Sequence, residues 1–295
     1  MAYGILFGRA RGKWAVDDRL ELESDLAEAM DLPTGFVALD DLVNGLADQA
    51  LEDLPRGRGR TWVYRGWLLH PSEYAELHEA LSERGDRLLV PPDAFELASC
   101  VPHWAPLLGD RTPPTVWTED DAPLGAWVLA SEVLGPPPWI VKDHIKSAKE
   151  QWSQACFVPA GATFDQFAEI CGNLVDIRGD RFFGGLVVRK FVNLLPIPYR
   201  TSFGQAHDEH RLIFWHGRLV AAAPYFDAQV EPLDYRQFAW LGKEIPSPFF
   251  SADVARLADG GTTVIEINDG GCTTLPERMD PEELYEAVFR SRRGR

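Results

Sequence analysis

The order of apolar and polar residues in the first hundred positions predicts short strands alternating with helices. Short apolar runs that end at turn residues indicate strands, whereas apolar residues three and four positions apart indicate amphipathic helices. Strands are predicted at 3–7, 61–66 and 87–90, and helices at 20–30 and from a capping Ser72 to Arg84. Strand, helix and strand in this close order predict a small α/β unit with some parallel pairing.

The rest of the chain is divided by the proline-rich segments 113–114 and 136–138. Its pattern predicts strands at 115–117, 139–142, 185–195, 210–215, 219–223, 249–258 and 262–268, and helices at 122–134, 163–175 and 281–293. His216-Gly217 predicts a tight hairpin turn, and Asp280 is the expected cap of the last helix. The predicted fold class is α/β, with α+β lobes in the second part.

Length, composition and charge narrow the classes of function. The 295 residues are enough for two domains, and we expect a preceding α/β domain over 1–110 and a second domain over 111–295. The net charge of −16, from 45 acidic and 29 basic residues, argues against general binding of nucleic acid or of anionic membranes. It leaves open a small phosphorylated ligand held by a few local cations. There is no apolar run of roughly 18 residues that would span a membrane, and residues 1–11 lack the pattern of a secretion signal.

The cysteines and histidines give no metal or disulfide pattern. Four cysteines stand without C-x-x-C spacing, which predicts idle thiols in a cytoplasmic protein; they are Cys100, Cys156, Cys171 and Cys272. His207 and His210 are three positions apart without a third ligand, so we interpret them as ordinary loop histidines. The segment Gly8-Arg-Ala-Arg-Gly12 is no P-loop, because no Gly-Lys-Ser/Thr follows it.

The segment Thr-Thr-Val-Ile-Glu-Ile-Asn-Asp-Gly-Gly at 262–271 carries the strongest chemical signal. Alternate side chains of a strand share a face, so Glu266 and Asn268 are expected on one side, with Val264 one step further back on that side. A carboxylate and an amide oxygen so placed suit Mg²⁺. The glycines let the backbone approach a ligand closely, or only let it turn. A strand ending in an Asn-Asp-Gly turn is the plainer interpretation.

A series of charged residues lies inside or beside apolar strands of the second part. An ion buried without a partner costs several kcal/mol, so these residues must meet partners or a ligand. Oxygen ligands for a metal together with separate cations are what a metal–polyphosphate site requires. The series consists of Lys142, Lys146, Arg189, Lys190, Glu209, Arg211 and Asp253.

Over residues 110–290 this order resembles that of the carboxylate–amine ligases of the ATP-grasp superfamily. The resemblance rests on an acidic residue in a strand, Asp253, followed by Val-Ile-Glu-Ile-Asn-Asp-Gly-Gly at 264–271. It rests also on a Glu-x-Arg strand, Glu209 to Arg211, followed by a hairpin. Within the superfamily the chain looks most like the clade distinguished by two arginines and a lysine, which we assign to Arg65, Arg189 and Lys142.

The resemblance implies two lobes that clamp ATP behind a small preceding domain, and Mg-dependent formation of an amide through an acyl phosphate. Implied metal ligands are Asp253, Glu266 and Asn268. Implied nucleotide contacts are Lys142 and Lys146 at the phosphates, Arg189, Lys190, Phe191 and Val192 on the inter-lobe strand beside the adenine, and Glu209. Implied catalytic residues are Arg211 at the transferred phosphoryl group, Lys146, and Arg65 as a bidentate clamp on the substrate carboxylate.

Each assignment has a plainer alternative. Lys142 and Lys146 would then be solvated lysines, Glu209 and Arg211 would pair across the hairpin with Arg218, and Arg65 would stack between Trp62 and Trp67. Because Arg189 and Lys190 alternate, at most one of them is expected to face the cleft.

Two features depart from the superfamily pattern. Segment 143–155 contains no glycine where a glycine-rich phosphate loop is common, so phosphate contact would rest on lysines and Ser147. Arg189-Lys190 stands where an acidic or amide residue is frequent. Two alternatives therefore stay open: a phosphotransferase on the same fold, and a non-catalytic nucleotide-binding module. The expected partners are a small-molecule or peptide carboxylate and an amine acceptor, and the sequence identifies neither of them, nor the oligomeric state.

Overall fold

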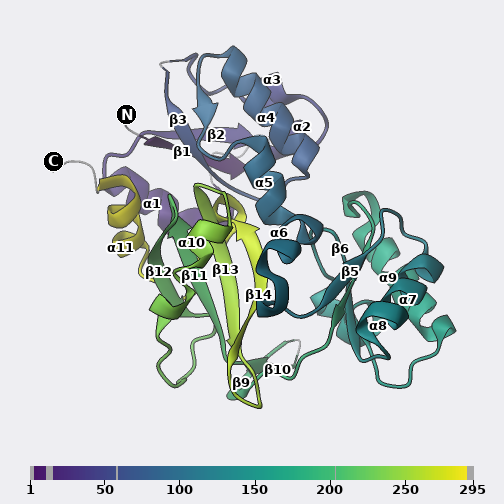
Figure 1. Ribbon diagram of the computed structural model, residues 1–295. Coiled ribbons are helices and arrows are strands. Elements are labelled where there is room, and N and C mark those ends of the chain that lie inside the picture. The colour runs from purple at the N-terminus through teal and green to yellow at the C-terminus, as the bar shows by residue number, and fades with distance from the viewer. Residues whose placement is uncertain (1–2, 11–15, 58, 203, 291–295) are drawn as a thin grey trace.

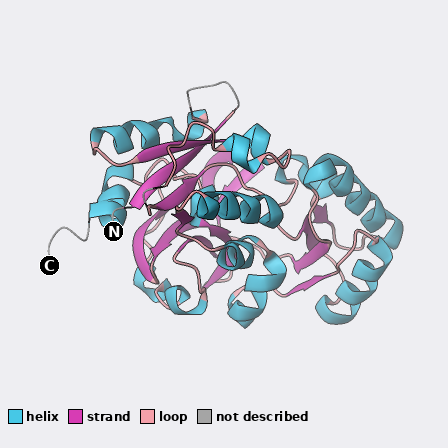
Figure 2. Cartoon of the chain, turned by 90° about the horizontal axis from the view of Figure 1, so that it is seen from above, coloured by secondary structure: helices cyan, strands magenta, loops and turns pink. Residues whose placement is uncertain are grey.

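A computed structural model describes residues 3–10, 16–57, 59–202 and 204–290 (Figure 1). Within these residues the strands form three four-stranded sheets and one two-stranded sheet. The second of the large sheets, with its helices, lies at one end of the molecule, to the right in both views (Figures 1 and 2). None of the helices in these ranges has the length and apolar character needed to cross a membrane.

The first sheet is parallel and has the strand order β2-β1-β3-β4. Its central strand β1 contains Ile5, Leu6 and Phe7, all fully buried, as expected for a parallel strand covered on both faces. The strands are β1 (Tyr3–Arg9), β2 (Thr34–Ala38), β3 (Thr61–Arg65) and β4 (Arg87–Leu88), and the helices are α1 (Glu21–Ala29), α2 (Leu39–Leu42), α3 (Ala47–Ala50) and α4 (Pro71–Glu83). The predicted small α/β unit with parallel pairing is confirmed.

The start of α4 differs from the prediction. Ser72 is not its cap, because Pro71 already occupies the first helical position and His70 precedes it. The Glu73 carboxylate accepts a hydrogen bond from the His70 N–H at 2.7 Å. Proline suits this position because its missing N–H would have no partner there.

Helices α5 (Pro92–Ser99) and α6 (Val101–Leu108) lead to the second sheet, which is antiparallel with the order β5-β8-β6-β7. The expected domain division near residue 110 falls in the 3₁₀ turn Gly109–Arg111, and we retain it as a proposal. The second-sheet elements are β5 (Thr115–Trp117), α7 (Pro123–Leu134), β6 (Trp139–Asp143), α8 (Trp152–Ala155), β7 (Phe157–Val158), α9 (Phe164–Arg178) and β8 (Leu186–Lys190). Strand β8 is shorter than the predicted run 185–195, because the chain leaves the sheet after Lys190.

The third large sheet is antiparallel, with the order β12-β11-β13-β14. The predicted hairpin turn is confirmed, since His216 and Gly217 both have positive φ, 47° and 73°. The elements are β11 (Glu209–Trp215), β12 (Arg218–Pro224), α10 (Leu241–Glu244), β13 (Phe249–Arg256), β14 (Thr262–Asp269) and α11 (Pro281–Tyr285), with β9 (Pro196–Thr201) and β10 (Gly204–His207) forming the small sheet. Asp280 caps α11 as predicted. A π-helical turn, Glu286–Arg290, follows it, and positions 291–293 of the predicted helix lie outside the described residues.

The two faces of the third sheet have different surroundings. One face presents Leu212, Phe214 and Phe250, which pack with Trp104 of α6 in a continuous apolar core. The other face presents Ile213, Trp215 and Phe249 at one end, where they pack into the core beneath the first sheet. Charged residues occupy the remainder of this second face. We call this part, with Glu209, Arg211, Asp253 and Glu266, the charged face. Lys142 of the second sheet contacts it through Glu266.

Candidate functional site

One row of cross-strand neighbours forms the centre of the charged face. Arg211 of β11 lies opposite Asp253 of β13, and Asp253 lies opposite Glu266 of β14. Directly opposed residues project to the same side of a sheet. Arg211 donates from Nε and Nη2 to the two Asp253 carboxylate oxygens at 2.8 and 2.7 Å, and from Nη1 to the Thr274 carbonyl at 2.8 Å. Arg211 therefore pairs with Asp253 rather than with Arg218, and three strands bring one cation and two carboxylates together.

A β-bulge sets the direction of Glu266. Asp253 pairs with Glu266 but Val254 pairs with Val264, so Ile265 is an extra residue in β14. The bulge resets the alternation of side chains. Val264 consequently lies in the apolar core with Val254, on the opposite face from Glu266. The prediction that Val264 shares the face of Glu266 was wrong for this reason, whereas Asn268, opposite Ser251, does share it.

Lys142, at the end of β6, joins the second sheet to this row. Its ammonium donates to Glu266 Oε1 at 2.8 Å, and the Lys142 side chain is only 5% exposed. Burial alone would raise the pKa of Glu266, but Lys142, Lys149 and Lys146 together hold that pKa well below its usual range. A carboxylate this strongly surrounded by cations stays ionised and available to a ligand.

Lys149 is a site residue that the sequence reasoning left without a role. It begins the 3₁₀ turn Lys149–Gln151, and part of its side chain is open to solvent. The charge of Glu266 raises the pKa of Lys149 above its usual value, with smaller contributions from Glu209 and Asp253, against the opposing effect of desolvation. Desolvation and the charges of Lys142 and Lys149 lower the pKa of Lys146, against the opposing effect of Glu266. The spacing of Lys142, Lys146 and Lys149 by four and three residues was the only signal for it.

The segment without glycine is organised by Asp143. The Asp143 carboxylate, fully buried, accepts hydrogen bonds from the backbone N–H groups of Ile145 and Lys146 at 2.7 and 2.5 Å. Its other oxygen accepts from Arg178 Nε at 2.8 Å. The turn that carries Lys146 is therefore held by a carboxylate side chain, where a glycine-rich loop would rely on backbone amides alone.

Glu209, on the same face, is a carboxylate whose pKa lies above its usual value. Burial, together with repulsion from Asp253 and Glu266, raises the pKa of Glu209 to about 7, and Lys149 and Arg211 offset only part of this. Repulsion from Asp253 and Glu266 thus adds to the burial that favours the protonated form of Glu209.

This raised pKa gives a prediction for the pH dependence of stability. The pKa of Glu209 rises on folding from its ordinary value of 4.5 to about 7, so the folded state holds the proton more tightly. The stability that this group contributes is complete below pH 4.5 and is lost as the pH rises through 7. In metal-free buffer, the free energy of unfolding of Glu209→Gln relative to wild type should therefore increase between pH 4.5 and 7 and stay level above. Urea titrations measure this difference, and a flat profile would contradict the assignment.

The strand predicted to lie beside the adenine ends before Phe191. Phe191 and Val192 do not belong to a strand but to the link between the second and third sheets. Phe191 packs edge-on against Phe157, which stacks on Trp152. Within the described residues, the backbone of Val192 makes no backbone hydrogen bond.

The side chain of Lys190 is held at the end of helix α7. Its ammonium donates to the carbonyl of Leu134, the last residue of α7, at 3.0 Å and to that of Pro136 just beyond the helix at 2.9 Å. Lysine is favourable there, because the last carbonyls of a helix lack partners. The side chain of Arg189 points towards β14, where it donates to the Ile265 carbonyl. As the alternation implied, the two side chains diverge.

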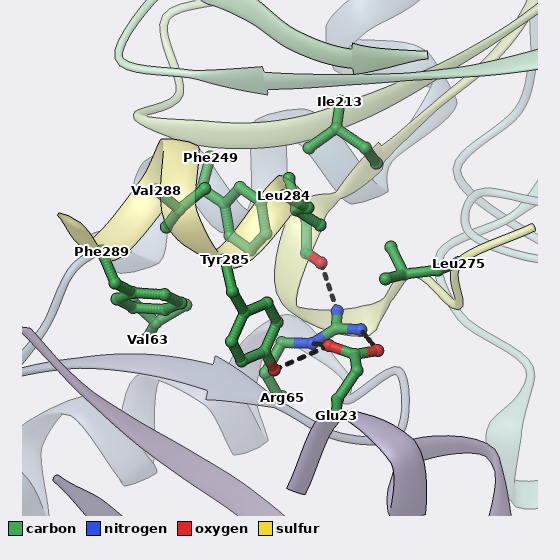
Figure 3. A pocket seen from close by; sticks show the side chains of 11 residues that line it. Glu23, Val63, Arg65, Ile213, Phe249, Leu275, Leu284, Tyr285, Val288 and Phe289 are labelled. Atoms are coloured by element: carbon green, nitrogen blue, oxygen red, sulfur yellow. Dashed lines mark hydrogen bonds and ion pairs between the residues drawn. The ribbon is translucent and has the colours of Figure 1, made fainter. Parts of the chain in front are cut away.

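Arg65 is buried beside the turn that follows β14, where its side chain bonds Glu23 (Figure 3). Its Nε and Nη2 donate to the Glu23 carboxylate at 2.9 and 2.5 Å, and Nη1 donates to the carbonyls of Gly270, Gly271 and Thr273. The adjoining cavity measures about 10 Å³, room for at most one water molecule. The bidentate fork expected to clamp a substrate carboxylate holds Glu23 in this structure, and the cation over the Trp62 ring is Arg60 rather than Arg65.

The remaining candidates lie apart from the charged face. His210 belongs to β11 and not to a loop; its ring bonds Asp208 and Tyr235, at 2.8 and 3.0 Å, on the other side of the sheet. All four cysteines are free thiols. Ligand atoms of Glu96, Cys100 and His103 lie within 4.8 Å of one another, but burial raises the pKa of the Cys100 thiol to about 12, which keeps it protonated.

Comparison with known families gives a match over residues 133–288, to the model described as an ATP-grasp domain, family 3 of the R-2-K clade. No curated protein matches the chain. The matched segment contains the whole row and every lysine described above, and it covers more than half of the 295 residues.

Solved structures with a similar fold span almost the whole chain. D-cycloserine synthetase DcsG has 15% identity and a TM-score of 0.62, covering 96% of this chain and 98% of its own. A RimK domain protein ATP-grasp from Sphaerobacter thermophilus DSM 20745 has 13% identity and a TM-score of 0.56, covering 92% of each chain. Macrocyclase MdnC, bound with precursor peptide MdnA from Microcystis aeruginosa MRC, has 16% identity and a TM-score of 0.52, covering 98% of this chain and 100% of its own. At these identities the likeness establishes the fold.

Proposed function

The chain belongs to the ATP-grasp superfamily, in family 3 of the R-2-K clade, and on that premise we propose that it is an ATP-dependent carboxylate–amine ligase. The expected α/β fold of ATP-grasp type agrees with this membership. The substrates that we propose are a small-molecule or peptide carboxylate and an amine acceptor. Similar folds occur in a synthetase of D-cycloserine and in a ligase complexed with a precursor peptide. We also propose a cytoplasmic location, which agrees with four unpaired cysteines.

The observation that carries the proposal is the convergence of opposite charges between two sheets. Arg211, Asp253 and Glu266 form one row of the third sheet, and Lys142 of the second sheet contacts Glu266. Lys146 and Lys149 add two more cations beside the row. Gathering charges in one half-buried place has a desolvation cost, which favourable interactions with a ligand can offset. A nucleotide polyphosphate with a divalent cation interacts favourably with both the lysines and the carboxylates.

The residues present fit a magnesium ion. Asp253, Glu266 and Asn268 offer oxygen ligands from one face of neighbouring strands, which is the donor set that Mg²⁺ prefers. Repulsion from Asp253 and Glu266 adds to the effect of burial on the pKa of Glu209, and a cation bound beside these carboxylates would reduce that repulsion. When bound, Mg²⁺ would neutralise phosphate oxygens and polarise the transferred phosphoryl group. Asp253 now pairs with Arg211 and Glu266 with Lys142, so both cations are expected to turn towards the phosphates when the metal binds.

In the proposed reaction, a substrate carboxylate oxygen attacks the γ-phosphorus of ATP and ADP leaves. The amine then attacks the acyl carbon, inorganic phosphate leaves, and the nitrogen loses a proton to solvent. Lys142, Lys146 and Lys149 would neutralise the phosphates, and Arg211 would face the transferred group. Such catalysis depends on positioning and charge neutralisation and requires no nucleophilic side chain. We propose that adenine lies beside Phe191, with the free backbone groups of Val192 as its hydrogen-bonding edge.

Release of ADP tests the proposal directly. Purified protein is incubated with ATP, Mg²⁺ and panels of carboxylates and amines, and products are identified by mass spectrometry. We expect ADP formation that requires both Mg²⁺ and a carboxylate–amine pair, with an amide as product. A phosphate ester as product would favour a phosphotransferase. ATP binding by calorimetry without turnover over a broad panel would favour a non-catalytic module.

A further inference from the structure

Arg189 is a buried cation whose position the proposed chemistry does not explain. Its side chain is 8% exposed, and within the described residues no ion pair joins it to a carboxylate. Burial lowers the pKa of Arg189 to about 10, and the charge of Glu266 offsets only part of that effect. Burying an unpaired guanidinium costs free energy, so a structure that retains one is expected to use it.

The hydrogen bonds of Arg189 lead to the bulge in β14. Nη1 donates to the carbonyl of Ile265, the extra residue, at 2.6 Å, and Nη2 donates to Thr112 Oγ1 at 2.7 Å. Nε donates to Thr115 Oγ1 at 3.1 Å, and the guanidinium carbon lies 5.4 Å from the Trp104 ring centroid. The guanidinium is thereby fixed from three sides.

Thr112 extends this contact to the preceding residue. Its hydroxyl donates to the Val264 carbonyl at 2.8 Å while accepting from Arg189. Arg189 and Thr112 thus hold two successive carbonyls, those of Val264 and Ile265, directly before Glu266. A bulge disrupts the ladder of backbone hydrogen bonds, and buried carbonyls there need other partners.

We propose that Arg189 is a positioning residue, which acts with Thr112 to hold the bulge and so to direct Glu266 towards the metal and phosphate site. The inference rests on the proposed function and goes beyond it, because it gives Arg189 a role away from the adenine. Arg189 also belongs to β8, which pairs with β6 so that Val187 lies opposite Lys142. The same residue therefore fixes Glu266 of the third sheet relative to Lys142 of the second.

A pair of threonine variants separates this role from general stability. Thr112→Val removes the bond to the Val264 carbonyl and one partner of Arg189, whereas Thr115→Val removes a partner of Arg189 but no contact with the bulge. Valine keeps the shape of threonine in both variants. Arg189→Met removes the guanidinium, and Arg189→Lys restores the charge without the fork.

Electron paramagnetic resonance measures the binding of Mn²⁺, a substitute for magnesium, in the presence of a non-hydrolysable ATP analogue. Thermal unfolding of each variant is measured in parallel. Loss of a group that orients a ligand typically weakens metal binding by about 10- to 100-fold. We expect this loss in Thr112→Val and Arg189→Met, a smaller loss in Arg189→Lys, and wild-type affinity in Thr115→Val. Metal-free binding of the analogue should not change.

Wild-type Mn²⁺ affinity in folded Thr112→Val protein would overturn the positioning role, whatever its melting temperature. Equal losses in Thr112→Val and Thr115→Val would also overturn it, since only the first variant touches the bulge. Thr112→Val decides the matter even when Arg189→Met does not fold. A wild-type protein that binds neither Mn²⁺ nor the analogue would instead overturn the proposed function itself, and the inference with it.

Discussion

Replacing Glu266 by glutamine is expected to lower ATP-dependent turnover by roughly 100- to 1000-fold, because a metal ligand contributes several kcal/mol of charge stabilisation to the transition state. The side chain would keep its shape and an oxygen that accepts from Lys142, so the fold should persist. What the variant loses is the negative charge opposite Asp253, and with it the affinity of the charged face for a divalent cation.

ADP release at saturating ATP, measured over a range of Mg²⁺ concentrations, provides the readout. Raising the Mg²⁺ concentration should restore part of the activity, since the lost ligand weakens binding rather than abolishing the site. Glu282→Gln, an exposed glutamate in the first turn of α11, is the control and should retain wild-type turnover. If Glu266→Gln and Asn268→Ala both turn over ATP at the wild-type rate, the row is not the site of the reaction.

The residues of the row were predictable because each of them stands out within its own short segment of sequence. Glu266 and Asn268 stand two positions apart in an apolar strand, and Asp253 and Arg211 interrupt other apolar strands. The bulge was not predictable, since one extra residue in β14 becomes visible only when its pairing with β13 is known. Lys149 was missed because its spacing from Lys142 and Lys146 is a weak signal in an irregular turn, and its relation to Glu266 depends on tertiary structure.

The two arginines assigned to the clade show the limit of sequence reasoning most clearly. Their burial was not visible, and neither were their partners, which lie far away along the chain. Arg189 meets Ile265 across 76 residues, and Arg65 meets Glu23 across 42 residues and Gly270 across 205. The sequence signalled that these arginines need partners, but only the fold decides whether the partner is a ligand or the protein itself.

Arg65→Met is expected to reduce the free energy of unfolding by about 3–5 kcal/mol, because removing one partner of a buried ion pair leaves the other charge uncompensated. Arg65 and Glu23 are 4% and 5% exposed, and among the described residues Glu23 would keep only the Tyr285 hydroxyl as a partner. The loss also frees the turn after β14, whose carbonyls at Gly270, Gly271 and Thr273 bond Arg65. Urea unfolding followed by circular dichroism measures the change.

A double variant and a surface control identify the cause. Adding Glu23→Gln to Arg65→Met removes the stranded charge and should recover part of the lost stability, so the two effects are not additive. Arg236→Met breaks the ion pair with Asp234 on the surface, where solvent screens the charges, and should leave stability unchanged. The contrary outcome is stability close to wild type in Arg65→Met, together with a raised KM for the carboxylate substrate. That result would return Arg65 to the role of a substrate clamp and would mean that Glu23 occupies the place of the substrate carboxylate.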